Sequence, residues 1–546
     1  MSSKGTTIKY AGSFREQLTV RGLVIGSIGA VVLTMSSMFV ALKLSSLPWP
    51  IMFVALVSMF ALKGLGKTNI NEINVAHTAM SAGAMVAGGL AFTIPGIWML
   101  NPNADVDYVS LTIVTLGGVI LGLIFTSLIR KYFIVTKELP YPMGQAAAET
   151  LKIGDAGGKK AVLLFSSMGV GALFTWLRDS VGKIPATFMS SKMMNYGSMA
   201  GIWISPMLIA VGYIIGPLAI GIWFLGALIG DFGILLGGQY FGIFDMAEAS
   251  AIKSSLGIGL MVGTGIGIIV KGILPKAKEI FGSMFFKDSI GDSIVPLRWA
   301  PFVMAVIVLL FTFIANMGFL ASIITVLGVW LAVAMSAQCV GQSGINPMEI
   351  FGIIVLIAAK AVSTIGQTEA FFVAAAVAVA CGLVGDVMND FKAGYILKSD
   401  PKAQWIAEVT GSIIGAVVSV AVLIIIVQAY GTEVFGSEMF PAAQASAVAA
   451  MVGGISHMPA FIIGLVTAVI LYCVNFPVMT LGLGVYLPFY LSATAFIGGM
   501  IRLLVDKVFP EFEKKGTGSI IASGLLGGEA IVGVILALIL AIQIIA

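Results

Sequence analysis

Long apolar runs separated by short polar segments follow one another along the chain. They lie near residues 22–42, 48–63, 74–100, 109–130, 161–177, 200–238, 254–271, 299–316, 319–338, 346–362, 368–385, 404–430, 441–475, 479–501 and 519–545. An apolar helix of about 20 residues crosses the core of a bilayer, and some runs allow two crossings or a re-entrant hairpin. The pattern predicts an all-α polytopic integral membrane protein with about 16 transmembrane helices, some broken or re-entrant around a central cavity.

Composition supports a membrane protein and excludes most water-soluble enzyme classes. Of the 546 residues, 59% are hydrophobic and 10% are charged, whereas soluble domains contain about 25% charged residues. The net charge of +4 gives no reason to expect a nucleic-acid partner. Three cysteines without CxxC spacing and two distant histidines predict neither a disulfide framework nor a structural zinc site. We expect no metal and no cofactor.

Loop charge predicts the orientation of the chain in the membrane. Basic residues gather in the N-terminal segment and in loops 130–160, 271–298 and 502–515, whereas loops 101–108 and 431–440 are acidic. Basic loops face the cytoplasm. The first apolar run is preceded by a basic segment and lacks a cleavage pattern, so we interpret it as a transmembrane helix. The sequence therefore predicts a multi-pass protein of the cell inner (cytoplasmic) membrane with a cytoplasmic N-terminus.

Short segments that resemble each other predict that the chain consists of two related halves. Residues 142–146 (PMGQA) resemble residues 441–445 (PAAQA), and two glycine-rich runs each contain a central proline, Pro217 or Pro488. Repeats that meet near the bilayer midplane build the sites of many secondary transporters. The predicted boundaries are an N-terminal cytoplasmic segment 1–21, a first transmembrane half 22–271, a cytoplasmic linker loop 272–298 and a second transmembrane half 299–546.

Motifs of soluble catalysis are absent from the sequence. It contains no HExxH, no GxSxG and no GxxxxGK[ST], so neither a zinc protease, a serine hydrolase nor a P-loop ATPase is indicated. The chain is therefore not expected to be an enzyme. Energy for transport would come from an ion gradient.

Four polar residues share one helix face at the start of the third apolar run. Asn74, His77, Thr78 and Ser81 follow helical spacing, and Glu72 precedes them. Polar groups within a membrane usually face the protein interior or a water-filled cavity. We predict that the four residues bind substrate and that Glu72 and His77 are candidates for proton coupling. The alternative is a helix cap followed by a packed polar face.

A short helix after two prolines is a second candidate. Pro140 and Pro142 interrupt the chain, and the free amides at the start of the following helix could bind a substrate carboxylate. Tyr141 and Gln145 are predicted to bind substrate, and Glu149 is a proton-coupling candidate. The alternative is a helix in a cytoplasmic loop.

Two further polar positions accompany breaks between apolar runs. Asn346 precedes Pro347 in a polar turn that could line a pore. Gln444 is the fourth residue of the segment 441–445 (PAAQA), as Gln145 is the fourth residue of the similar segment 142–146 (PMGQA). Both Asn346 and Gln444 are predicted to bind substrate. An ordinary turn is the alternative at Asn346.

Two aspartates four residues apart end a long apolar run. One helix face carries both Asp386 and Asp390, and Lys392 could neutralise one of them. We expect this polar cluster to act in gating or in structure. The alternative is a solvated cytoplasmic loop.

The last two candidates lie near the C-terminus. Tyr486 precedes Pro488 and is predicted to bind substrate. Glu529 lies ten residues into the run that starts at Ser519, about 15 Å along a helix and close to the middle of a bilayer core. A lone carboxylate there suggests either proton coupling or a pair across helices.

Six segments in the same order resemble the oligopeptide transporter (OPT) family, and more its prokaryotic and yellow-stripe-like branch. They are residues 72–83 with 92–95 (FTIP), 139–152 (LPYP-x-G-x-A-x-A-E-x-L-K), 346–347, 386–404 (GD-x-M-x-D-x-K-x-GY), 484–502 and 522–533. The likeness extends from about residue 15 to 540. His77 stands where the family usually has glutamine, and Gln145 where it often has threonine. Histidine titrates near physiological pH, so it could alter pH dependence.

The resemblance implies a proton-coupled symporter, with substrates that range from short peptides to metal–chelate complexes. We therefore interpret the chain as a secondary active transporter that imports small oligopeptides or peptide-like solutes across the cytoplasmic membrane. Its expected partners are the solute, protons and membrane lipid, and self-association stays open. An importer of siderophore-like metal chelates is the alternative. A passive channel and an intramembrane enzyme are less favoured, because broken helices and repeats suit alternating access.

Overall fold

The computed structural model describes residues 9–44, 47, 51–156, 159–276, 294, 299–344, 346–437, 439–514 and 516–545. Most of the predicted linker loop 272–298 and the first eight residues of the predicted N-terminal segment lie outside the described residues. The described chain is overwhelmingly helical, which confirms the predicted all-α class.

The contacts within the chain divide it into two compact units. Unit 1 comprises Met1–Ala156, Ile273–Gly453 and Val534–Ala546, and unit 2 comprises Gly157–Gly272 and Gly454–Gly533. Each unit thus combines residues from both predicted halves: unit 2 takes one stretch from each, and unit 1 takes one from the first and two from the second. The units therefore interleave the two halves instead of dividing the chain near residue 272.

Unit 1 contains most of the long helices. Its elements are α1 (Phe14–Gln17), α2 (Val20–Leu44), α3 (Ile51–Gly64), α4 (Ile70–Ala91), α5 (Pro95–Leu100), α6 (Tyr108–Arg130), the π-helix η1 (Lys131–Thr136), α7 (Pro142–Ala156), the 3₁₀ helix η4 (Leu274–Lys276), α15 (Ala300–Phe313), α16 (Phe319–Ser343), α17 (Met348–Val362), α18 (Gln367–Leu397), α19 (Pro401–Tyr430), the 3₁₀ helix η7 (Thr432–Val434) and α20 (Ala443–Gly453).

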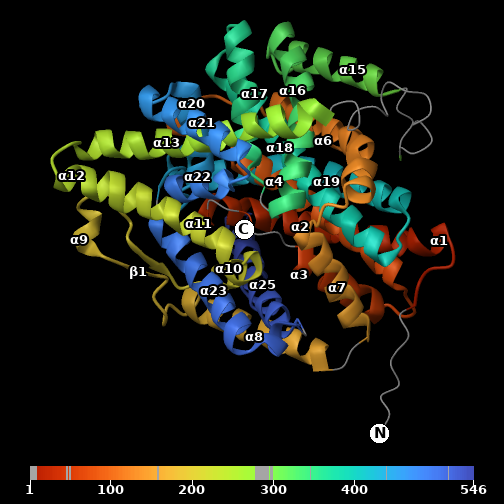
Figure 1. Cartoon of the computed structure of the whole chain (residues 1–546). Coiled ribbons are helices and arrows are strands. Elements are labelled where there is room, and N and C mark those ends of the chain that lie inside the picture. Colours follow the sequence, from red (N-terminus) through yellow and green to blue (C-terminus); the bar gives the residue numbers. More distant parts are fainter. Residues whose placement is uncertain are drawn as a thin grey trace. The chain divides into compact units, whose positions relative to one another are not determined.

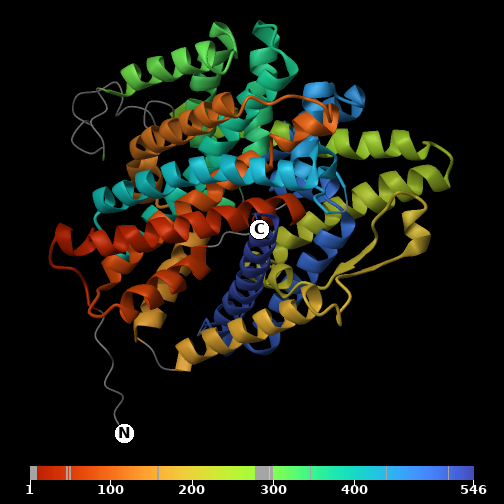
Figure 2. The same ribbon diagram turned by 180° about the vertical axis from the view of Figure 1, so that it is seen from behind.

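Two helices form the centre of unit 1. Every residue of α4 is buried, and so is every residue of α18 from 370 to 394. Figure 1 shows α18 among α4, α6, α16 and α17, all of which it contacts. Figure 2 shows the red α2 beside the cyan α19, and both of these helices pack against α4. Polar side chains on α4 and α18 are therefore enclosed by other helices.

Matching caps and glycines position α6 and α19 against this centre. Asp107 caps α6 and Asp400 caps α19, each by accepting backbone N–H bonds of the first turn. Bonds from the side chain and backbone of Ser110 also lower the pKa of Asp107. In both helices a glycine lies 11 residues after the cap (107 to 118, 400 to 411). Gly118 contacts the α18 backbone and Gly411 the α4 backbone, where any side chain would collide.

Unit 2 is built from shorter helices and one small hairpin. Its elements are α8 (Lys159–Asp179), β1 (Thr187–Met189), α9 (Ser191–Met194), β2 (Gly201–Trp203), α10 (Pro206–Ile215), α11 (Pro217–Ala227), the π-helix η2 (Leu228–Gly237), α12 (Gly238–Tyr240), α13 (Met246–Gly267), the π-helix η3 (Ile268–Ile273), α21 (Met458–Cys473), α22 (Val478–Tyr486), α23 (Phe489–Val508), α24 (Pro510–Lys514) and α25 (Thr517–Ile545). Strands β1 and β2 pair antiparallel, with Thr187 opposite Trp203. The final residues of η3 and α25 belong to unit 1.

Two broken helices pack against each other in unit 2. Gly216, with a φ of 93°, and Pro217 separate α10 from α11, and Pro488 separates α22 from α23. Helix α10 packs on α23 and α11 packs on α22. The prolines end each first segment because they lack an N–H and clash with the preceding turn. The two proline-broken runs noticed in the sequence are thus neighbours in space.

Nine helices in the described part of the chain are long and apolar enough to span a membrane, or up to ten if α20 and α21 form one broken span. Shorter apolar helices include α10 and α15. By this measure the expected count of about 16 is not reached, in part because prolines divide long runs into half-length helices.

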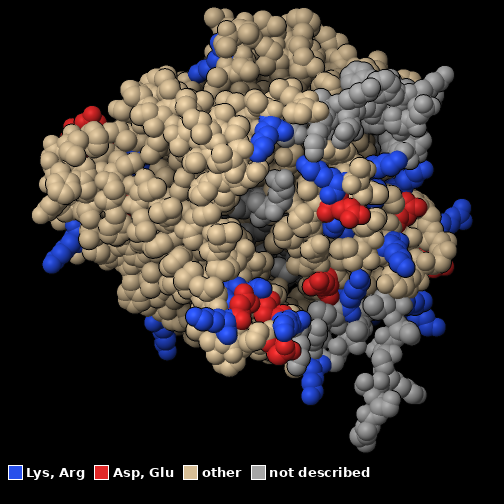
Figure 3. Space-filling view, viewed as in Figure 1, with Lys and Arg blue, Asp and Glu red and all other residues tan. Residues whose placement is uncertain are grey.

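The face seen in Figure 3 has wide areas without charged side chains, and Val20, Leu218 and Phe241 are exposed. The chain is a multi-pass membrane protein.

Candidate functional site

The polar face of α4 is fully enclosed. Asn69 caps α4 by accepting the Glu72 N–H, which starts the helix so that the predicted residues share one face. Asn74, Thr78 and Ser81 are completely buried there. The spacing argument from the sequence is therefore correct in its geometry, and the face meets the C-terminal half of α18 and the start of α19.

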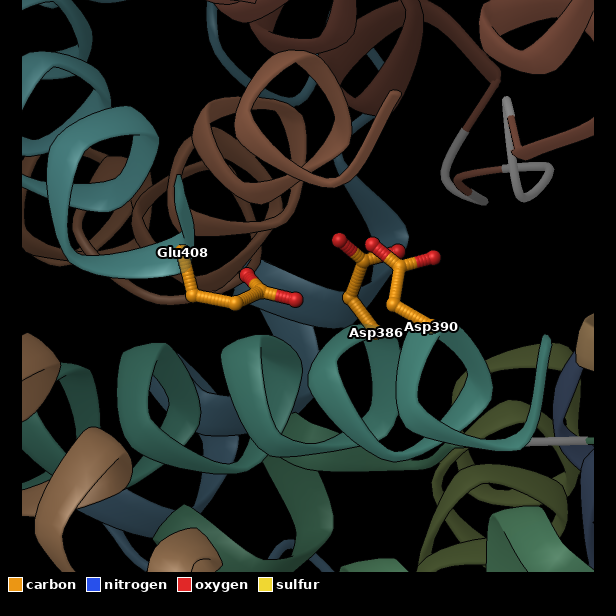
Figure 4. A group of neighbouring side chains, drawn as sticks. All are labelled: Asp386, Asp390 and Glu408. Atoms are coloured by element: carbon orange, nitrogen blue, oxygen red, sulfur yellow. The ribbon is translucent and has the colours of Figure 1, made fainter. Parts of the chain in front are cut away.

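Three carboxyl groups meet opposite this face. Asp386 and Asp390 project from neighbouring turns of α18, and Glu408 of α19 points toward them (Figure 4). One oxygen from each group lies within 4.8 Å of the other two. All three residues have no exposed surface. We call Asp386, Asp390 and Glu408 the carboxylate triad.

Most polar atoms around the triad have no hydrogen-bond partner. Ser81 Oγ donates to Asp390 Oδ2 at 2.9 Å. The other five carboxylate oxygens of the triad have no hydrogen-bond partner among the described residues, and neither do Gln404 Oε1 and Asn74 Oδ1. Buried polar atoms are normally satisfied, so a group of unsatisfied acceptors indicates a place for donors or cations.

The histidine beside the triad is oriented to receive a proton. His77 Nε2 lies 3.0 Å from the carbonyl oxygen of Ile51. Because a carbonyl only accepts, Nε2 carries the hydrogen in the neutral ring, and Nδ1 is an acceptor. His77 Nδ1 lies 3.7 Å from Asp390 Oδ1 and has no hydrogen-bond donor. Two acceptors that face each other repel unless a proton or a cation lies between them.

Electrostatics leads to the same expectation. Two unit charges 4.8 Å apart repel by about 3.5 kcal/mol at an effective dielectric constant of about 20. Three ionised groups would give three such terms, in addition to the desolvation of each charge. Among the ion pairs of the described residues, only His77 approaches the triad. The triad can therefore stay compact only by binding positive charge, either protons or a hard cation that accepts oxygen ligands.

Lys392 does not supply this charge. It lies two residues after Asp390, about 200° around the helix and thus on another side of α18. No ion pair of the described residues joins Lys392 to either aspartate. The expected neutralisation by Lys392 does not occur in the structure.

Glu72 is held by other groups near the start of α4. Arg21 donates from Nε and Nη2 to its two oxygens, each at 2.7 Å. Thr19 and Thr68 donate to the same carboxylate. This proton-coupling candidate is therefore a paired carboxylate and stands apart from the triad, with Asn74 and Thr78 between them along α4.

Other predicted residues of unit 1 make structural contacts or face outward. Tyr141 is buried and donates to the carbonyl of Ala337 at 2.9 Å. Asn346 Nδ2 donates to the carbonyl of Cys381 at 2.8 Å, which ties the turn between α16 and α17 to α18. Gln145 and Glu149 on α7 are exposed.

The start of α7 and the start of α20 also contain predicted substrate contacts. Among the α7 N-terminal amides expected to bind a substrate carboxylate, the Gly144 N–H donates to Asn389 Oδ1 at 2.9 Å. Gln444 at the start of α20 is buried, and its Oε1 has no hydrogen-bond partner. Gln444 thus keeps an acceptor for a ligand, whereas one α7 amide is already engaged.

Unit 2 holds the two remaining candidates. Glu529 pairs with Arg178 Nη2 at 2.9 Å and accepts bonds from Ser205 Oγ and the Met207 N–H. Tyr486 is half-buried beside a cluster that includes Trp223. Of the two sequence interpretations of Glu529, the structure has the geometry of the pair across helices.

Glu408 and Gln404 were not among the predicted site residues. A signal was present, because Glu408 is an isolated carboxylate within the apolar run 404–430. Gln404 donates from Nε2 to the Asp390 carbonyl at 2.7 Å, a contact that local spacing cannot reveal.

Comparisons with known proteins agree with this membrane architecture. A profile of the family described as "OPT oligopeptide transporter protein" matches residues 17–540. A protein of Haemophilus influenzae named "Putative oligopeptide transporter" is 25% identical over 580 aligned positions, which cover 90% of each chain. The family profile includes the triad, the polar face of α4 and both proline-broken helix pairs. The chain therefore belongs to the oligopeptide transporter family and is a transporter.

Proposed function

We propose that the protein is a proton-coupled symporter that imports small oligopeptides or peptide-like solutes across the cytoplasmic membrane. The observation that carries this proposal is the carboxylate triad, because three enclosed carboxyl groups with no lysine or arginine partner among the described ion pairs need bound positive charge. A proton is the smallest such charge, and the absence of a P-loop motif favours a gradient as the energy source.

Coupling requires that the triad changes its charge during the transport cycle. Protons bound at the triad would allow α4, α18 and α19 to pack together. Their loss would restore mutual repulsion of about 3.5 kcal/mol for each ionised pair. A free-energy change of this size is enough to shift the balance between two conformations of a helix bundle. The triad thereby links proton occupancy to the packing of unit 1.

Helix directions in unit 1 support two related halves with inverted topology. Along α4, Ser81 contacts Asp390, whereas the later Gly89 contacts Val379 of α18. Residue numbers rise on one helix while they fall on the other, so α4 and α18 are antiparallel. If α4 and α18 are equivalent helices, a two-fold axis perpendicular to them relates the halves. Inverted repeats with broken helices are a common plan of secondary transporters.

Charge supports a cytoplasmic location for the end of unit 1 where α4 begins. Lys67, Lys398 and Lys402 are exposed at this end. Asp105 and Asp107 are exposed near the opposite end. By the positive-inside rule, this distribution of charge supports a cytoplasmic location of the lysine-rich end and of the N-terminal segment.

Uptake into proteoliposomes tests the function. The purified protein is exposed to an imposed pH gradient with labelled di- and tripeptides, and in parallel with metal–chelate complexes. We expect peptide accumulation that collapses with a protonophore and does not respond to ATP. Accumulation that follows a sodium gradient at fixed pH would overturn proton coupling. Accumulation of chelates without peptides would replace the substrate class by the alternative.

A further inference from the structure

Along α4 and α18, polar side chains extend from the triad toward one end, the end at which α4 begins. Toward the other end, residues 370–385 of α18 are exclusively apolar or glycine. Residues 82–91 of α4, which run beside them, are likewise apolar or glycine. A proton that reaches the triad along these two helices therefore has polar partners only toward the α4 N-terminus.

A row of hydrogen-bonded polar groups leads from Asp390 toward the end at which α4 begins. We call this row, formed by Gln404, Thr78, Asn74, Ser399 and Asn71, the file. Gln404 Nε2 donates to the Asp390 carbonyl at 2.7 Å and approaches Thr78 Oγ1 at 3.4 Å. Thr78 Oγ1 donates to the Asn74 carbonyl at 3.0 Å. Asn74 Nδ2 in turn donates to Ser399 Oγ at 3.2 Å. These contacts, two of which end on main-chain carbonyls, join α4, α18 and α19.

The file ends where α18 gives way to the loop before α19. Asn71 Nδ2 donates to Ser399 Oγ at 3.1 Å and to the Leu397 carbonyl at 2.9 Å. The next residue, Lys398, is exposed. From Asp390 to Leu397 there are seven residues, about 10 Å along the helix. The triad is thus a short distance from the lysine-rich end of unit 1.

Two acceptors along this file have no donor. Asn74 Oδ1 and Gln404 Oε1 are completely buried and have no partner within the part of the chain that the structure describes. A buried amide oxygen normally accepts at least one hydrogen bond. Water or hydronium that passes along the file would supply donors to both atoms.

The N-terminal segment covers the outer end of the file. Asn71 Oδ1 accepts the Ala11 N–H at 2.9 Å. Gln17 Oε1 accepts the Asp400 N–H at 2.8 Å. The ion pair of Arg21 with Glu72 fixes the segment to α4. Residues 9–21 therefore lie over the entrance and hold it closed in this conformation.

We propose that Asn71, Asn74, Thr78, Gln404 and Ser399 line a proton pathway between the carboxylate triad and the cytoplasmic end, closed by residues 9–21. This inference rests on the proposed proton coupling and names the route by which the same site exchanges its protons. Asn74 is central because its main-chain carbonyl accepts from Thr78 and its side-chain amide donates to Ser399. Its side-chain oxygen is one of the two unsatisfied acceptors.

The charged and titratable groups near this route come from five helices. They are Glu72 and His77 of α4, Asp386 and Asp390 of α18, Glu408 of α19 and Arg21 of α2. Arg130 of α6 lies over the ring of Phe391. Only the triad and His77 lie at the inner end of the file, so a block at Asn74 separates them from the N-terminal ion pair.

Two variants test the pathway in proteoliposomes that contain a pH-sensitive dye. Asn74→Leu places an apolar side chain in the file, and Ser399→Ala removes the oxygen that joins Asn74 to Asn71. The matched control is Ser419→Ala, because Ser419 is a buried α19 serine whose hydroxyl donates to its own helix at Gly415. Each protein is first checked for folding by size-exclusion chromatography and thermal unfolding. If Asn74→Leu does not fold, the proton flux of Ser399→Ala tests the pathway instead.

Blocked proton exchange has a specific signature. We expect solute-driven proton flux to fall about tenfold or more in Asn74→Leu. Ser399→Ala should show the same direction of change in proton flux, and its solute counterflow should stay near the wild-type rate, because exchange needs no net release of protons. Ser419→Ala should behave as wild type. Wild-type proton flux in folded Asn74→Leu and Ser399→Ala overturns the pathway alone. Solute transport by the wild-type protein without proton movement overturns the proposed function, and the pathway with it.

Discussion

Replacement of Glu408 by glutamine tests the central element of the proposed mechanism. Glutamine keeps the shape of the side chain but removes its charge and its ability to bind a proton as a carboxylate. At separations of up to 4.8 Å, the change removes two of the three repulsive pairs of the triad, about 7 kcal/mol in total at an effective dielectric constant of about 20. Less positive charge is then needed for α18 and α19 to pack together.

The number of protons that accompany each solute molecule should therefore fall. A gradient of one pH unit stores about 1.4 kcal/mol for each coupled proton, which corresponds to a tenfold solute gradient. If Glu408→Gln removes one coupled proton, the steady-state accumulation ratio under a gradient of one pH unit should fall about tenfold. Counterflow between equal solute pools should persist, because it does not depend on the net gradient.

The measurement compares steady-state peptide accumulation in proteoliposomes of wild type, Glu408→Gln and Glu349→Gln. Glu349 is the matched control, because it is a buried glutamate of α17 outside the triad. Wild-type accumulation by a folded Glu408→Gln protein, with wild-type dependence on the pH gradient, would refute the reasoning. Equal loss in both glutamine variants would show a general effect of buried carboxylates and would also contradict it.

Three further predictions concern stability and packing. Arg178→Gln should lower the free energy of unfolding by about 3–5 kcal/mol, because Glu529 then remains buried without its cation. Thermal unfolding in detergent measures this loss, and adding Glu529→Gln to the same protein should recover part of it. Gly411→Ala should destabilise the protein by about 1–3 kcal/mol, because the added methyl group meets an α4 backbone carbonyl, whereas Gly169→Ala, with open space at that position, should not. Glu72→Gln should release the N-terminal segment and accelerate its cleavage by trypsin, and an unchanged cleavage rate would show that the backbone contacts suffice.

Local sequence patterns determine the helices and their polar faces. The three-and-four spacing places Asn74, His77 and Ser81 on one side of α4, and the four-residue spacing places Asp386 and Asp390 on one side of α18. Both patterns are independent of the rest of the fold, because they follow from the geometry of a single helix. The family could also be inferred at this level, since its motifs are short and keep their order along the chain.

Tertiary structure decides which polar faces meet. Ser81 and Asp390 are separated by 309 positions in the chain, and Ser205 and Glu529 by 324. The helical spacing of residues in the sequence does not indicate contacts between residues so far apart in the chain. Glu529 therefore could be a lone proton site or half of a buried pair until the packing of unit 2 placed Arg178 beside it.

The carboxylate triad itself depends on how two successive helices pack. Glu408 lies on α19 beyond the turn that follows α18, and in the sequence it is a single charge in an apolar run. It approaches the two aspartates because α18 and α19 both pack against α4, where Gly411 allows close contact of the backbones. A helix encodes which of its sides is polar, but the contacts between helices depend on side-chain volumes and on the space that glycines leave. For this reason the polar faces could be predicted from the sequence, whereas the triad and the hydrogen bonds between it and the start of α4 required the folded chain.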